Sequence, residues 1–178
     1  MTAPRLVGPQ VALVPVAAAV ADAVVDGRTD DLEPLLQQSG LRPGTGWPHA
    51  DSAGALAGAG SGVPVAAEDL RCWLVTAGGE VLGECGWKHR PDPDGTVELT
   101  YGLAAPARGR GLGTEAVALV VAWSERQPGV RRLAADVLVG NEPSRRLLRR
   151  LGFVEQPVDG RQVRAERGEP RIRGRHVC

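Results

Sequence analysis

Lysine is almost absent from this chain, and its absence excludes one kind of phosphate site. Lys88 is the only lysine among 21 lysine and arginine residues. A nucleotide-binding loop of the G-x-x-x-x-G-K-[ST] type requires a lysine directly after its last glycine. The glycine-rich segment of this chain, residues 106–115, contains no lysine, so it is not a loop of that type.

Aromatic residues are also scarce, and this scarcity counts against a nucleic-acid partner. They make up 3% of the chain, and the formal net charge is zero. Nucleic-acid-binding proteins commonly combine a basic surface with aromatic side chains that stack on bases. The arginines at 145–150 and in the C-terminal tail are a weaker signal for the opposite conclusion. We therefore expect no nucleic-acid partner.

The cysteines are few and form no metal-binding pattern. Cys72, Cys85 and Cys178 show no C-x-x-C pair and no Cys/His ligand spacing, so we expect no metal site. If Gly78-Gly79 forms a two-residue hairpin turn, Cys72 lies opposite Cys85 in a non-hydrogen-bonded pair. Such Cα atoms are about 4.5 Å apart, which permits a strained disulfide. Nothing else suggests export, so we predict reduced thiols and a cytoplasmic protein.

No apolar run is long enough to cross a membrane. The run VALVPVAAAVADAVV, residues 11–25, faintly resembles a signal peptide, but Pro15 and Asp22 interrupt it. It is also shorter than the roughly 20 apolar residues that a spanning helix needs. A strand followed by a helix is the better interpretation, and we expect no membrane partner.

The order of the strand and helix patterns predicts a mixed α/β (α+β) fold in one domain, residues 1–178. Strands that alternate with helices after residue 96 predict a mixed sheet covered by helices, and hairpins predict antiparallel neighbours. The patterns predict strands at 5–16, 71–77, 80–88, 96–104 and 131–140, helices at 17–27, 29–40, 114–127 and 141–152, a short helix near 52–59, and a last hairpin at 163–177.

The segment PARGRGLGTE, residues 106–115, places three glycines directly before a helical pattern. The first backbone N–H groups of a helix have no intrahelical acceptor, and together with the helix dipole they attract anions. Glycines let an anion approach the backbone without a Cβ atom in the way, and Arg108 and Arg110 add positive charge. The segment therefore predicts a site for a phosphate or pyrophosphate.

The spacing of these glycines distinguishes between two ligand-binding motifs. Gly109 and Gly111 begin the dinucleotide pattern G-x-G-x-x-G, but Thr114 occupies its last position. The arrangement Arg108-x-x-Gly111-x-Gly113 instead resembles the [QR]-x-x-G-x-[GA] motif of the GNAT superfamily of acyl-CoA N-acyltransferases.

Two longer blocks extend this resemblance over residues 96–155, about a third of the chain. The block VELTYGLAAPARGRGLGTEA is similar to E-x-G-Y-x-L-x-P-x-x-R-G-x-G-x-x-[TS]-E-A in the ribosomal-protein-alanine-acetyltransferase-like branch. The block NEPSRRLLRRLGFVE is similar to that branch's N-x-x-S-x-x-L-L-x-x-L-G-F. On these motifs the chain is identified as a member of the superfamily.

The resemblance implies the GNAT fold, a mixed and mostly antiparallel central sheet that is splayed between strands 96–104 and 131–140 and flanked by helices. It implies acetyl-CoA (coenzyme A) as the cofactor, with the pantetheine arm in the splay. Free backbone N–H groups near Leu103 and Ala104 would bind that arm. The pyrophosphate would lie on Arg108, Gly109, Arg110, Gly111, Leu112, Gly113 and Thr114.

The resemblance also implies direct attack of an amine on the thioester. Glu98 occupies a strand position that often supplies the general base; the alternative is a strand glutamate paired with an arginine. The usual pKa of a glutamate is about 4.3, so Glu98 would need burial or a bridging water to act near neutral pH.

The second block implies how the leaving thiolate is protonated. Many members use a tyrosine seven residues after Asn141, but Leu148 occupies that position here. By resemblance to the branch, Ser144 contacts the thiol instead; the alternative is that it caps the helix. Asn141 would cap the helix and contact the pantetheine arm.

Acceptor recognition in the family comes from the first two helices, their loop and the last hairpin. We therefore expect an acceptor pocket among Trp47, His49, Asp51, Trp87, His89 and Tyr101, although each aromatic residue could simply be a core residue. Residues 1–70 carry 8 acidic and 3 basic side chains, which weakly favours a cationic acceptor. An α-amine loses its proton more easily than a lysine amine, which favours protein N-termini slightly over lysines.

The sequence thus predicts an acetyl-CoA-dependent N-acetyltransferase that acts on a protein N-terminus or a small-molecule amine. The alternative is a non-catalytic module that binds or senses acyl-CoA. Homodimers are common in this branch, so the resemblance also implies a homodimer.

Overall fold

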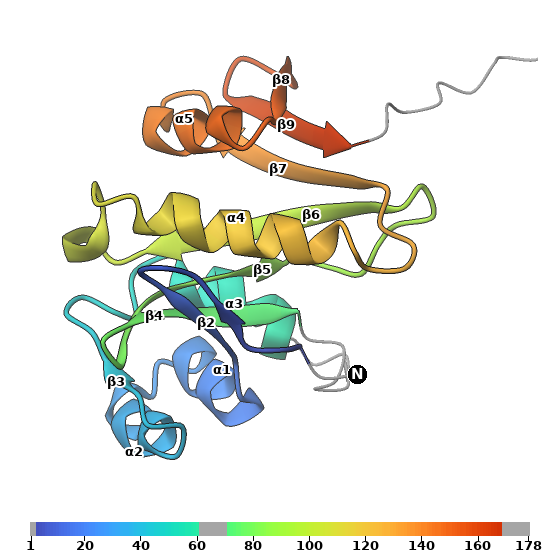
Figure 1. The fold of residues 1–178 in the computed structure, drawn as a ribbon. Coiled ribbons are helices and arrows are strands. Elements are labelled where there is room, and N and C mark those ends of the chain that lie inside the picture. Colours follow the sequence, from blue (N-terminus) through green and yellow to red (C-terminus); the bar gives the residue numbers. More distant parts are fainter. Residues whose placement is uncertain (1–2, 61–70, 169–178) are drawn as a thin grey trace, which may run out of the picture.

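The computed structural model describes residues 3–60 and 71–168 (Figure 1). The described strands form one sheet in the order β1-β2-β4-β5-β6-β7-β9-β8, and β3 pairs with β5. The strands are β1 (Leu6–Val7), β2 (Ala12–Pro15), β3 (Arg42–Pro43), β4 (Cys72–Ala77), β5 (Glu80–Trp87), β6 (Thr96–Leu103), β7 (Arg132–Leu138), β8 (Val154–Pro157) and β9 (Gln162–Gly168).

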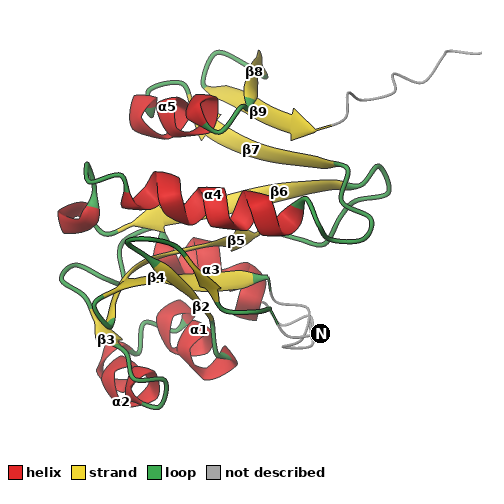
Figure 2. Ribbon diagram, in the orientation of Figure 1, coloured by secondary structure: helices red, strands yellow, loops and turns green. Residues whose placement is uncertain are grey.

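Helices cover both faces of the sheet (Figure 2). The helices are α1 (Ala18–Val25), α2 (Leu32–Gln37), α3 (Ser52–Gly60), α4 (Leu112–Ser124) and α5 (Glu142–Arg150), with short 3-10 turns η1 (Thr29–Asp31) and η3 (Ala105–Ala107). In the part of the chain that the structure describes, no helix is both long and apolar enough to cross a bilayer.

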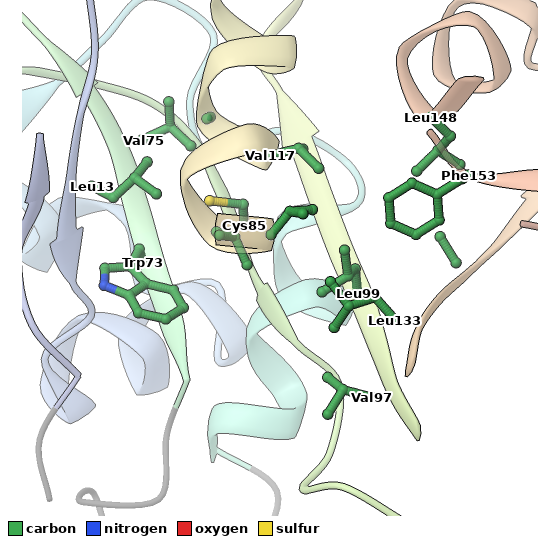
Figure 3. Packing of buried hydrophobic residues seen from close by; sticks show 14 of the residues in the cluster. Leu13, Trp73, Val75, Cys85, Val97, Leu99, Val117, Leu133, Leu148 and Phe153 are labelled. Carbon is green, nitrogen blue, oxygen red and sulfur yellow. The ribbon is translucent and has the colours of Figure 1, made fainter. Parts of the chain in front are cut away.

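Alternating side chains divide the buried residues into two cores. Along β4, Trp73 and Val75 belong to the core beneath α4 and α5, whereas Cys72 and Leu74 belong to the core beneath α1, α2 and α3. Successive side chains of a strand point to opposite faces, so one strand contributes to both cores. Figure 3 shows the first core, in which Trp73 and Cys85 lie beneath α4 and Leu148 of α5 lies close to Phe153.

The sheet opens between β6 and β7. All strand pairs in it are antiparallel except β3–β5 and β6–β7. The parallel β6–β7 ladder comprises three residue pairs, from Thr96–Arg132 to Glu98–Ala134. Beyond Glu98 the two strands separate toward the end of the sheet where α4 begins (Figure 1). The predicted mixed, splayed sheet is confirmed.

The hairpin of β4 and β5 departs from its predicted register. Next to the turn, Thr76 pairs with Val81 as expected, but the register shifts by one residue before Val75. Leu82 is the additional residue of this β-bulge, and beyond it Cys85 faces Trp73 rather than Cys72. The predicted Cys72–Cys85 pair is therefore wrong, whereas the predicted free thiols of both residues are confirmed.

Three other predicted elements differ in detail. The predicted strand 5–16 is a short hairpin, because the Glu115 carboxylate of α4 accepts backbone N–H groups of Gln10 and Val11 and holds a turn there. Helix α4 begins two residues earlier than predicted, at Leu112. Residues 163–168 lie in β9, which pairs with β7 and β8, and residues 169–177 of the predicted last hairpin lie outside the described residues.

The positions of the two cysteines lead to a test of their redox state. Burial raises the pKa of Cys72 to about 12 and the pKa of Cys85 well above its usual value. In a Cys178→Ser variant, we expect neither thiol to react quickly with a thiol reagent in the native state, because the thiolate is the reactive form. Both should react once the protein is unfolded without reductant. A loss of both thiols from the unfolded count would indicate the disulfide that the register excludes.

Candidate active site

A cleft of about 470 Å³ opens where β6 and β7 separate. Its walls come from the N-terminal half of α4, from residues along the length of α5, from β5 and β6, and from the segment that precedes α3. Many of the predicted site residues line it together. They are His49, Asp51, Tyr101, Leu103, Arg108, Gly109, Gly111, Gly113, Thr114, Asn141 and Ser144.

The glycine-rich segment forms the N-terminus of α4 at one wall of the cleft. Gly109 and Gly111 have φ angles of 75° and 82°, which favour glycine, and Gly111 is the N-cap. The first intrahelical bond at this end runs from the N–H of Glu115 to the carbonyl of Gly111. The preceding N–H groups of the helix are therefore left for an anion. Arg110 is exposed outside the cleft lining, and the Leu112 side chain is buried in the core.

The edge of β6 that faces the splay carries unpaired donors. Backbone bonds of an antiparallel pair alternate between the two sides of a strand. The N–H of Ala104 donates to the carbonyl of Leu82 at 2.8 Å, so the predicted free N–H of Ala104 is wrong. By the same alternation, the N–H groups of Tyr101 and Leu103 point away from β5 and toward the splay. Arg108 closes the end of the strand by donating its Nε–H to the carbonyl of Leu103.

A pair of hydroxyl groups bridges the splay. The Tyr101 hydroxyl lies 2.5 Å from Oγ of Ser144 at the start of α5. Burial raises the pKa of Tyr101, and the hydrogen bond with Ser144 partly opposes this rise. The helix cap comes from Asn141, whose Oδ1 accepts the N–H of Ser144 at 3.3 Å. The Ser144 hydroxyl therefore contacts Tyr101 in the cleft, while the predicted capping role of Asn141 is confirmed.

Glu84, which is not among the predicted site residues, is a fully buried carboxylate in the wall of the cleft. Its Oε2 accepts hydrogen bonds from Nε1 of Trp47 at 2.9 Å and from Oγ of Ser52 at 3.0 Å. Its Oε1 lies 2.9 Å from Nε2 of His49, and the two side chains are 0% and 9% exposed, respectively. Trp47 thus supports the cleft by holding Glu84.

Gly102 of β6 allows this pair to lie directly against the strand. A Cβ atom at position 102 would be 2.7 Å from Cε1 of His49 and 3.3 Å from Oε1 of Glu84. Only a glycine leaves room for the imidazole there. One signal in the sequence points to Glu84. It is a carboxylate in the middle of the predicted strand 80–88, and a carboxylate is almost never fully buried without partners. Two of the partners, however, Trp47 and His49, come from a segment with no predicted helix or strand, and Ser52 begins the predicted short helix.

Glu98, the predicted general base, lies elsewhere. Its carboxylate is 15% exposed and forms an ion pair with Lys88, and it does not line the cleft. Its role as base stays a prediction that this geometry does not favour. Trp87 is also outside the cleft, because its Nε1 donates to Oγ of Ser124 at 2.7 Å and its ring packs on Trp123. His89 is exposed and contacts the carbonyl of Arg90.

Residues 28–154 match a family model described as an acetyltransferase (GNAT) domain. An uncharacterized N-acetyltransferase, p20, of Bacillus licheniformis is 31% identical over 77 residues. The match spans less than half of either protein, 43% of this chain and 43% of that relative.

Solved structures match over almost the whole chain. A protein of Bordetella pertussis described as a GNAT-family acetyltransferase is 26% identical, with a TM-score of 0.62 over 93% of this chain and 99% of that chain. RimJ of Mycobacterium smegmatis, solved with CoA-disulfide, is 24% identical, with a TM-score of 0.62 over 94% of this chain and 87% of that chain.

The contact between His49 and Glu84 predicts a pH-dependent contribution to stability. The carboxylate of Glu84, 2.9 Å from Nε2, raises the pKa of His49, although burial opposes the rise. A raised pKa in the folded state stabilises the fold fully below the unfolded value, about 6.5, and this gain is lost as the pH rises through the folded value. The difference in Tm between wild type and His49→Gln should therefore be largest near about pH 6 and shrink toward about pH 9.

The matched control repeats this comparison in a Glu84→Gln background. There the same histidine substitution should show a much weaker trend with pH, because the carboxylate that raises the pKa is gone. A Tm difference that stays constant over the pH range in the wild-type background would contradict the contact. Scanning calorimetry measures both series.

Proposed function

Because the chain belongs to the GNAT family of acetyltransferases, we propose that it transfers the acetyl group of acetyl-CoA to a primary amine. One observation carries the proposal. The free N–H groups at the start of α4 and the unpaired edge of β6 face the same cleft. A ligand that combines a pyrophosphate with an amide-containing arm matches both sets of donors.

The residues of the cleft fit acetyl-CoA part by part. The first turn of α4 suits the pyrophosphate, and Arg146 and Arg150 of α5 add positive charge to the cleft lining. The N–H groups of Tyr101 and Leu103 suit the carbonyl groups of the pantetheine arm. The shared fold with RimJ of M. smegmatis, which was solved with CoA-disulfide, supports this assignment.

When bound, acetyl-CoA supplies a thioester whose carbonyl carbon accepts an amine. The chain must then hold a proton near the departing sulfur, and the hydroxyl groups of Ser144 and Tyr101 are in reach of one another at the splay. Leu148, at the position where many relatives carry a tyrosine, is fully buried. We therefore assign the protonation of the thiolate to Ser144, with Tyr101 as its hydrogen-bond partner.

The acceptor is a primary amine of a protein N-terminus or of a small molecule. Asp51 and the Glu84–His49 pair line the cleft, and this acidic wall favours an ammonium group. We place the chain in the ribosomal-protein-acetyltransferase-like branch on its two sequence blocks, as one catalytic domain. The free thiols of Cys72 and Cys85 support a reducing cytoplasm, and the homodimer stays a prediction of the resemblance.

Calorimetric titration with acetyl-CoA tests the proposal first. Gly111→Trp places a bulky side chain in the cleft at a φ angle of 82°, so we expect binding at least about tenfold weaker than wild type. Gly129→Trp is the matched control, because Gly129 has a φ angle of 81°, equally open surroundings and no place in the cleft lining. Equal loss in both variants would indicate misfolding, and wild-type protein that does not bind acetyl-CoA would overturn the proposed function.

Ser144→Ala tests the route of the proton to the sulfur. Asn141 caps α5 through the backbone N–H of residue 144, so the substitution removes the hydroxyl and keeps the cap. We expect kcat to fall about 10²-fold with unchanged acetyl-CoA affinity, measured by release of free thiol over an amine panel. A variant with wild-type kcat would contradict the role of Ser144. Wild-type protein that binds acetyl-CoA but acetylates no amine would favour the non-catalytic acyl-CoA-binding module.

A further inference from the structure

We propose that His49 accepts the proton of the incoming amine and that the buried carboxylate of Glu84 is the residue that positions it. This inference rests on the proposed acetyltransferase function. It replaces Glu98 as the base with a pair of residues that line the cleft.

The burial of Glu84 is the first argument. The side chain is completely buried, yet its two oxygens contact Trp47, Ser52 and His49 within 3.0 Å. Replacing a buried ion pair with apolar residues of similar volume is often neutral or stabilising, because removing a charge from water costs free energy. A carboxylate that accepts hydrogen bonds from Trp47 and Ser52 and lies 2.9 Å from an imidazole nitrogen at the wall of a cleft points to a chemical role.

The segment that carries His49 is fixed on the same carboxylate. Ser52 donates its hydroxyl to Glu84 and also accepts the backbone N–H of His49 at 3.0 Å. Trp47, two residues before His49, donates to the same carboxylate oxygen. Glu84 therefore contacts the imidazole and the side chains of Trp47 and Ser52 on either side of it, which is the arrangement expected of a positioning residue.

The contacts of the imidazole identify the nitrogen that accepts the proton. Nε2 lies 2.9 Å from Oε1 of Glu84, and we infer that it carries the hydrogen when the ring is neutral, because its electron pair would otherwise face the carboxylate. The electron pair of Nδ1 then accepts the backbone N–H of Asp51 at a long 3.3 Å. A hydrogen bond of that length is weak. An amine that enters beside Asp51 can displace it and reach Nδ1.

The position of His49 against β6 places this base beside the edge that is proposed to bind acetyl-CoA. The imidazole lies against Gly102, at the distance where a Cβ atom would clash. Gly102 stands between Tyr101 and Leu103, whose N–H groups face the splay. His49 therefore lies against Gly102, directly between the two residues whose N–H groups are proposed to bind the pantetheine arm.

The charges around His49 suit an α-amine acceptor. Glu84 from β5 raises the pKa of His49, Asp51 on its own segment also raises it, and burial and Arg108 from the loop before α4 lower it. The net effect is a rise above the usual value. An α-ammonium group, with a pKa of about 8, gives its proton to a histidine more easily than a lysine ammonium group does, with a pKa of about 10.4. We therefore infer that N-terminal amines react faster than lysine side chains.

The protons balance in this scheme. One proton of the ammonium group passes to Nδ1 of His49 and later to solvent. The amine nitrogen bonds to the acetyl carbonyl carbon, and the bond from that carbon to sulfur breaks. The proton that leaves the nitrogen as the amide forms ends on the thiolate, through the hydroxyl groups of Ser144 and Tyr101.

Four variants of the full chain test the inference. His49→Gln keeps a donor toward Glu84 and removes the base, and Glu84→Gln keeps the shape and removes the charge. His89→Gln is the control for the histidine, because His89 is exposed and lies outside the cleft. Glu80→Gln is the control for the carboxylate, because Glu80 lies on β5 like Glu84 but forms an exposed ion pair with Arg42 of β3. Acetyl-CoA affinity, pH profiles of kcat/KM and NMR titration of the histidine ring protons are measured for each.

His49→Gln should lower kcat about 10²-fold with acetyl-CoA affinity within about threefold of wild type. Glu84→Gln should lower the pKa of the His49 ring in the NMR titration and move the acidic limb of the kcat/KM profile to lower pH. Glu80→Gln should change neither. In wild type, a peptide N-terminal amine should react faster than the lysine side chain of an N-terminally blocked peptide.

Several outcomes would overturn the inference while the proposed function stands. One is a His49→Gln variant that binds acetyl-CoA and turns over within about threefold of wild type with the same pH profile. Another is a Glu84→Gln variant with an unshifted His49 titration, which would remove the positioning role. A loss of kcat in Glu98→Gln alone would return the base to Glu98. Wild-type protein that fails to bind acetyl-CoA would instead remove the proposed function itself.

Discussion

The early end of the parallel ladder between β6 and β7 is the constraint on which the site depends. Three residue pairs hold the strands together, and beyond Glu98 they separate. This separation leaves one edge of β6 without a partner strand and lets the first turns of α4 and α5 reach a common cleft. The hydrogen bond between Tyr101 and Ser144 then spans the opening. Fixed backbone donors therefore surround a space that the sheet does not fill.

A second set of contacts joins β5 to the segment before α3 at this cleft. Glu84 lies in the sheet, and its three partners come from the segment that precedes α3 and from the start of that helix. Because Glu84 is fully buried, its charge depends on these contacts for stabilisation. Backbone N–H groups thus line one side of the cleft, whereas the buried cluster of Glu84 and its partners lines the other side. Gly102 lets the two sides meet at one strand.

Features that depend on neighbouring residues could be predicted from the sequence. Glycines before an apolar helix predict an N-terminus open to anions, and the structure has Gly111 as the N-cap of α4. Asn141 before Pro143 predicts a capped helix, and Asn141 caps α5. The alternating pattern of residues 96–104 predicts a strand, and β6 spans Thr96–Leu103. These signals are local, because turns, caps and alternation are set within a few residues of chain.

Only the tertiary structure decided the features that need contacts between distant segments. One bulge at Leu82 reverses the facing of the β5 residues beyond it, so no count from the turn could pair Cys72 correctly. The N–H of Ala104 donates to the carbonyl of Leu82 in β5, and Glu98 forms an ion pair with Lys88. Glu84 meets Trp47 and His49 across 37 and 35 positions of sequence, respectively. The sequence alone determined the family, the glycine N-cap of α4 and the Asn141 cap of α5, because local pattern specifies them. Packing determined which carboxylate faces the cleft.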